Sequence, residues 1–163
     1  MAQRDRDQTG RARNSRPRDA LGRPQPYGRK GVPRIPDDLD LSPQGYLDYA
    51  QGLLDVGRAF HAHEVLEAAW KSAPDGERAL WQGLAQLAVG ITHIQRGNTR
   101  GATTVLQRAA ERIGEFGPAP YDVDAIGLSR HANALAEDLK LGAHIASCRL
   151  RPRLQVVCGP GSA

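Results

Sequence analysis

The hydrophobic positions from residue 42 onward recur at the three- and four-residue spacing that is typical of amphipathic helices. Ser42 followed by Pro43 indicates a helix start, because a serine side chain caps free backbone N–H groups and proline fits the first turn. Glycine, proline and asparagine then interrupt the pattern at intervals. The pattern predicts five helices, over residues 43–57, 58–72, 77–96, 99–116 and 122–141.

None of these segments shows the strict alternation of a β-strand, so the sequence predicts an all-α fold. Two helix–corner–helix stretches resemble each other at an offset of forty residues, since Gly57 aligns with Gly97 and Ala62 with Ala102. We therefore expect a five-helix, bundle-like domain built from two stacked helical hairpins plus a C-terminal helix. Such stacking is similar to tetratricopeptide-type arrays, although those arrays repeat at about 34 residues.

The third predicted helix has the composition of a buried element, because residues 79–95 include no charged side chain. Residues at i, i+3, i+7 and i+10 form a stripe in which glycine lets a neighbouring backbone approach closely. These residues are Gly83, Gln86, Gly90 and His93. We expect Gln86 and His93 to lie in that close contact, where buried polar groups need partners. The other expected packing and corner residues are Trp70, Gly97, Asn98 and Ala102.

The chain has 163 residues, of which 40% are hydrophobic, and this is enough for one modest core in a helical domain over residues 41–145. Residues 1–40 are expected to form a basic Arg/Pro/Gly-rich tail, largely disordered or wrapping the domain, and residues 146–163 a flexible C-terminal tail. Because no run of eighteen apolar residues and no apolar leader is seen, we expect a cytoplasmic protein that makes no membrane contact.

The positive charge is concentrated at the N-terminal end of the sequence. Residues 1–34 contain ten Lys or Arg and three Asp, a net charge of +7, whereas residues 35–163 carry a net charge of −3. Tyr27 is the one aromatic residue in the basic segment, which therefore lacks the stacking side chains of single-strand nucleic-acid binders. We expect a protein partner or a small ligand rather than nucleic acid.

A polar cluster is predicted where the second and third helices meet. His63 and Glu67 are four residues apart with Glu64 beside them, so an imidazole and two carboxylates share one flank of the second helix. Gln86 and His93 of the third helix are the expected partners of these side chains. His61 is expected to point toward solvent and to take no part in the cluster.

Two functions remain open for this polar cluster, and with them the question of whether the chain is an enzyme. In the first, the five side chains brace the helices of a non-enzymatic binding or interaction module. In the second, the chain is a metal-dependent hydrolase in which His63, Glu67 and His93 bind a divalent metal. Glu64 would then be the catalytic residue, a general base that activates a metal-bound water.

Several short motifs of the helical region occur together in one known family. They are Ala62-His63-Glu64-Val65-Leu66-Glu67, Trp70, Gly83-Leu84-Ala85-Gln86-Leu87-Ala88, His93, Arg96-Gly97-Asn98 and Gly101-Ala102. Over about residues 45–115, their order and spacing resemble the domain-of-unknown-function family 309. Ala85 stands where that family often has isoleucine. The resemblance implies a compact all-helical domain and no established activity.

Overall fold

The structure, a computed structural model, describes residues 16–157. The helices are α1 (Pro43–Asp55), α2 (Ala59–Ser72), α3 (Arg78–Gln95), α4 (Thr99–Phe116), α5 (Ala125–Lys140) and the short 3₁₀ helix η1 (Ser147–Leu150). Across residues 16–157 there is no β-strand, and the two β-bridges, Arg18 with Pro24 and Val123 with Gln155, are isolated. The predicted all-α fold with five α-helices is confirmed.

Side-chain caps determine where three of the helices begin. The side-chain oxygens of Ser42, Asn98 and Asp124 each accept a hydrogen bond of 3.0 Å from the backbone N–H three residues further on. The last helix therefore begins after Asp124, three residues later than the sequence predicts. Tyr121 and Asp122 have φ angles of 59° and 55°, which are incompatible with a right-handed helix.

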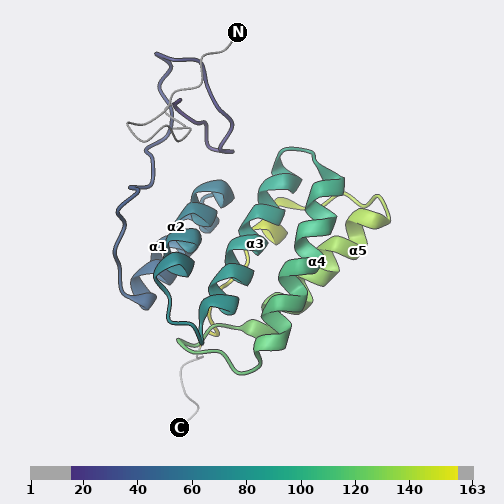
Figure 1. Cartoon of the computed structure of the whole chain (residues 1–163). Coiled ribbons are helices and arrows are strands. Elements are labelled where there is room, and N and C mark those ends of the chain that lie inside the picture. The colour runs from purple at the N-terminus through teal and green to yellow at the C-terminus, as the bar shows by residue number, and fades with distance from the viewer. Residues whose placement is uncertain (1–15, 158–163) are drawn as a thin grey trace.

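The five helices form an antiparallel series in which each packs mainly against the next one along the chain (Figure 1). Their apolar faces turn toward one another and form a single core. Fully buried leucines come from every helix, and they include Leu47, Leu66, Leu84, Leu106 and Leu135. Each such side chain contributes roughly 2 kcal/mol when it leaves water. No helix within the described part of the chain is long and apolar enough to span a membrane.

The small residues of α3 allow α4 to pack closely against it. A Cβ atom at Gly83 would lie 2.7 Å from Cγ1 of Ile113, and one at Gly90 would lie 2.5 Å from Cδ2 of Leu106. Gln86, predicted to share this contact, instead lines a hollow between α2 and α3. The predicted stripe is therefore divided between two neighbours, because its two glycines contact α4 whereas Gln86 faces the seam with α2.

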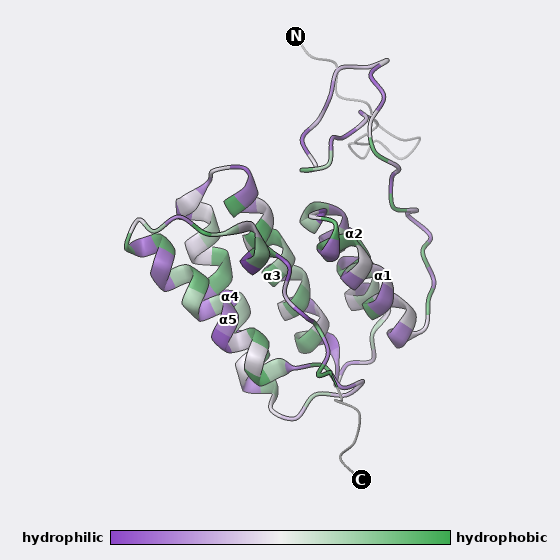
Figure 2. Cartoon of the chain, turned by 180° about the vertical axis from the view of Figure 1, so that it is seen from behind, coloured by the Kyte–Doolittle hydropathy of each residue, from purple (hydrophilic) through white to green (hydrophobic). Residues whose placement is uncertain are grey.

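The C-terminal segment, residues 145–156, crosses the helices on the side that Figure 2 shows. The sequence analysis assigns residues 146–163 to a flexible tail, whereas Leu154 is only 1% exposed and belongs to the core. The backbone N–H of Leu154 donates to Oε1 of Gln51 on α1 at 2.8 Å. Arg149 forms an ion pair of 2.6 Å with Asp138 on α5. The segment thus links the first and last α-helices. Cys158 lies outside the described residues.

Candidate functional site

Two adjoining hollows lie along the seam between α2 and α3, and we call them together the α2–α3 groove. They have volumes of about 150 and 130 Å³. Both are open to solvent, and both are lined by His63 and Val89. The first is also lined by Glu67, Trp70, Gln82, Ala85 and Gln86, and the second by Phe60, Thr92, His93 and Arg96.

Helical spacing explains why these residues share one surface. The lining positions of α2, from Phe60 to Trp70, follow one another at three- or four-residue steps, and so do most of those of α3, from Gln82 to Arg96. At 1.5 Å per residue, the two rows extend over about 15 Å and about 21 Å. The α2–α3 groove is therefore long and shallow rather than a closed pocket.

His63 and Glu67 form the polar contact at the centre of the groove. Nε2 of His63 lies 3.4 Å from Oε2 of Glu67, and Nζ of Lys71 lies 3.2 Å from Oε1 of the same carboxylate. Burial lowers the pKa of His63, and the charge of Glu67 opposes that shift only in part. His63 is therefore neutral at pH 7, and its contact with Glu67 is that of an uncharged imidazole with a carboxylate.

Gln86 brings an unsatisfied polar atom to the groove. Its Oε1 is buried and accepts no hydrogen bond from the described residues. A buried carbonyl oxygen without a donor costs about 1–3 kcal/mol. The atom belongs to a side chain that lines an open hollow, so a donor supplied by a bound molecule can satisfy it.

Glu64, the candidate general base, lies on a different side of α2. It lines a separate hollow with Ile35, Pro36 and Asp37, which Glu67 also borders. Burial raises the pKa of Glu64, and the positive charge of Arg18 opposes this. Glu64 and His63 do not line a common hollow. Glu64 therefore lies outside the α2–α3 groove, although it is predicted to share one flank of the helix with His63 and Glu67.

His93 is held by the corner between α3 and α4 rather than by Glu67. Its Nδ1 is 3.1 Å from Nδ2 of Asn98, whose Oδ1 caps α4. His93 lines the same hollow as His63 but not the one that Glu67 lines. Within residues 16–157, no three or more His, Cys, Asp or Glu side chains are grouped closely enough to hold a metal ion. The three predicted ligands are therefore not gathered into one metal-binding group.

His61 is buried, so its predicted exposure is wrong. It is 2% exposed, and its ring lies edge-on to Phe60 with centroids 5.6 Å apart. Arg18 and Asp19 from the N-terminal segment lie close enough to influence its charge. Burial and the neighbouring Arg58 and Arg18 lower the pKa of His61. The sequence pattern of α2 alone does not show that another segment covers this side of the helix.

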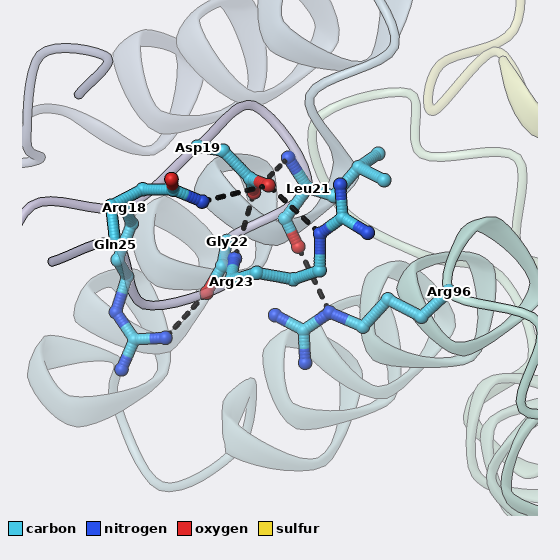
Figure 3. A network of polar contacts seen from close by, with 7 residues as sticks. All are labelled: Arg18, Asp19, Leu21, Gly22, Arg23, Gln25 and Arg96. Atoms are coloured by element: carbon cyan, nitrogen blue, oxygen red, sulfur yellow. Dashed lines mark hydrogen bonds and ion pairs between the residues drawn. The ribbon is translucent and has the colours of Figure 1, made fainter. Parts of the chain in front are cut away.

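Residues 16–25, which we call the N-terminal strap, pack at the end of the groove where α2 begins and α3 ends (Figures 1 and 3). Gly22 lies against the ring of Phe60, and a Cβ atom there would be 2.0 Å from Cγ of that ring. The guanidinium carbons of Arg18 and Arg96 lie 4.9 and 5.3 Å from the Phe60 ring centroid. Nε of Arg96 donates to the Leu21 carbonyl at 3.0 Å. The strap thus fixes two lining residues of the groove.

Sequence reasoning did not select Phe60, Val89 and Arg96 as site residues. Phe60 precedes His63 by one helical turn and Arg96 follows His93 by three residues, so helical spacing alone extends the polar cluster to both. The hydrophobic pattern of α3 predicts that Val89 is an ordinary core residue. Its partial exposure appears only when α2 and α3 are placed side by side.

The comparisons with known proteins agree with the sequence motifs of the helical region. Residues 47–105 match the model of the family described as Domain of unknown function (DUF309). These residues belong to that family.

The family match covers α2, α3 and most of α1, and it includes the residues of the α2–α3 groove. An uncharacterized protein of Bacillus subtilis (strain 168), YpuF, is 38% identical over 67 residues, which is 40% of this chain. The chain matches only 38% of the length of that relative. No solved structure gives a significant match.

Proposed function

We propose that this chain is a protein-interaction module that binds a helix of a partner protein in the α2–α3 groove. The size of the hollows supports a protein partner over a small ligand. Pockets for drug-sized molecules measure about 300–1,000 Å³, whereas the two hollows have about 150 and 130 Å³. Each is large enough for a side chain of a bound segment.

The shape of the groove supports a helical partner segment. Two hollows side by side along a seam about 15–21 Å long match a helix of about 10–14 residues, which places side chains on one face at three- and four-residue steps. Trp70, Val89 and Phe60 supply apolar contact surface in these hollows.

The buried Oε1 of Gln86 carries the proposal, because it is an acceptor that the described part of the chain leaves without a donor. A polar side chain of the bound helix that donates an N–H or O–H would satisfy it. The contact of His63 with Glu67 then has the role of a brace that holds the wall of the groove. A hydrolase that uses His63, Glu67 and His93 as metal ligands receives no comparable support from their positions.

Selection of helical peptides on the full-length protein tests this function. We expect a displayed library of amphipathic helices to give binders in the micromolar range. Val89→Trp, which fills both hollows, should weaken the affinity of these peptides at least about tenfold, because the apolar side chains of the peptide can no longer enter the hollows. The matched control is Asn133→Trp, which adds the same ring to an exposed position of α5.

The outcome does not depend on one variant alone. Thermal unfolding of Val89→Trp should show a folded protein, and NMR shift changes of the wild type should map to Ala85, Gln86 and Val89 when a selected peptide is added. Selected peptides whose binding is unaffected by Val89→Trp, and whose shift changes lie on α4 or α5, would contradict the proposed function.

A further inference from the structure

The charges at one end of the α2–α3 groove are not balanced within the described chain. Arg18 and Arg96 form no ion pair with a carboxylate among residues 16–157, and within this range their side chains donate hydrogen bonds to the neutral carbonyls of Gly22 and Leu21. A carbonyl acceptor orients a guanidinium without neutralising it. Both groups therefore keep their full charge while they are held in place against the Phe60 ring.

The acidic residue nearest to this end is already occupied. The carboxylate of Asp19 accepts hydrogen bonds from the backbone N–H of Leu21 and from both the backbone N–H and Nε of Arg23 (Figure 3). Nε2 of Gln25 lies 3.4 Å from the same carboxylate. Asp19 thus forms its direct ion pair with Arg23, whereas its charge acts on Arg96 without an ion pair.

The like charges also affect one another. Burial lowers the pKa of Arg96, and the positive charges of Arg18 and Arg23 lower it further, while the negative charge of Asp19 opposes them. Arg58 acts together with Arg18 on the neighbouring His61. A group of arginines held at a solvent-facing edge at an electrostatic cost is typical of a surface that meets a negative partner. We call Arg18 and Arg96 the arginine end of the groove.

The opposite end of the groove has a different character. There the lining residues Trp70 and Gln82 are uncharged, and the nearest carboxylate, that of Glu67 near the centre of the groove, is paired with Lys71. The groove is therefore polarised along its length. Arg96 lines the second hollow itself, so the arginine end begins where the apolar surface stops.

We infer that the helix bound in the α2–α3 groove is amphipathic and acidic at one end, with Asp or Glu side chains against Arg18 and Arg96. This inference rests on the proposed function and specifies the partner by its charge pattern. The apolar side chains of the helix fill the two hollows, and the carboxylates meet the arginine end one turn beyond them. Bidentate contacts of guanidinium with carboxylate then fix the direction in which the helix lies.

The test starts from a library of helical peptides whose polar positions are randomised. Peptides that bind the full-length protein are selected, and every peptide that also binds Val89→Trp is discarded. We expect an excess of Asp and Glu confined to one end of the retained helices. Their affinity should fall about tenfold for Arg96→Gln, and it should fall as the salt concentration rises. The matched control Arg130→Gln removes an exposed arginine of α5 and should leave the affinity unchanged.

The results separate the two proposals. Groove-dependent helices without an acidic excess, or with unchanged affinity for Arg96→Gln, would overturn the charge inference and leave the interaction function standing. A library that yields no groove-dependent helix would overturn both. A twenty-nucleotide single-stranded DNA that binds wild type, loses affinity for Arg96→Gln and is indifferent to Val89→Trp would assign the arginines to phosphate and overturn the inference.

Discussion

The two terminal segments of the described chain are attached to the same helices by different kinds of interaction. The N-terminal strap is held by guanidinium groups against a ring and by bonds to carbonyls, with much of its length exposed. The C-terminal segment instead buries Leu154 in the core and pairs its backbone with α1. Burial of apolar surface is insensitive to salt, whereas exposed charged contacts are screened.

The difference indicates which segment is structural and which can respond to a partner. A segment with a core residue separates from its domain only when the domain loses stability. A segment held by surface cation–π contacts of about 0.5–1 kcal/mol each can shift without such a loss. The N-terminal strap, which borders the α2–α3 groove, therefore has the freedom to adjust to a bound helix.

The largest expected effect belongs to the C-terminal segment. Leu154→Ala should lower the free energy of unfolding by about 2–5 kcal/mol, because it removes a buried side chain and leaves a cavity. Urea denaturation followed by circular dichroism measures the change. The control Val156→Ala, at a position that is 54% exposed, should have almost no effect. Equal stability of both variants would show that this segment is not part of the core.

A smaller effect is expected from the hydrogen bonds of the same segment. Gln51 accepts from the N–H of Leu154 and donates from Nε2 to the carbonyl of Pro152. Gln51→Ala should cost about 1–3 kcal/mol, because it leaves these partly buried backbone groups without their partner. Faster hydrogen exchange at the Leu154 amide, with the exchange in α3 unchanged, would confirm that the loss is local. Unaltered exchange there would contradict the assigned role of Gln51.

The smallest effect concerns the N-terminal strap. Arg18→Ala should lower the unfolding free energy by about 1 kcal/mol, since it removes one half-buried cation–π contact and a hydrogen bond to the Gly22 carbonyl. It should nevertheless speed hydrogen exchange at the Gly22 amide, which donates to the Asp19 carbonyl. Salt should have the same effect on the wild type, and the amide of Leu154 should respond to neither. If neither Arg18→Ala nor added salt changes the hydrogen exchange of the Gly22 amide, the strap is held as firmly as the C-terminal segment.

Most of the fold follows from the sequence because local signals and tertiary packing agree. Ser42, Asn98 and the corner glycines mark helix ends by backbone chemistry that does not depend on the rest of the molecule. The late start of α5 escaped prediction, because the positive φ angles of Tyr121 and Asp122 arise where the chain pairs with the C-terminal segment. A contact between residues so distant in sequence leaves no local pattern.

The candidate site was harder to predict because it depends on which neighbouring helix each face of α2 and α3 contacts. Helical spacing correctly predicts the contact between His63 and Glu67, since both lie on one helix. It does not decide that Gly83 faces α4 while Gln86 faces α2. Nor does it reveal that His61 is buried or that the strap brings Arg18 to Phe60. These features depend on long-range packing, which a single sequence records only weakly.

The contact between Gln51 and Leu154 joins residues that are 103 positions apart, whereas the helices otherwise pack on their immediate successors. Local helix pairs form early in folding because only short loops have to close, and contacts across a long separation form late. We therefore expect the docking of the C-terminal segment to be a late step of folding, which completes the core after the helix pairs that form the groove have assembled.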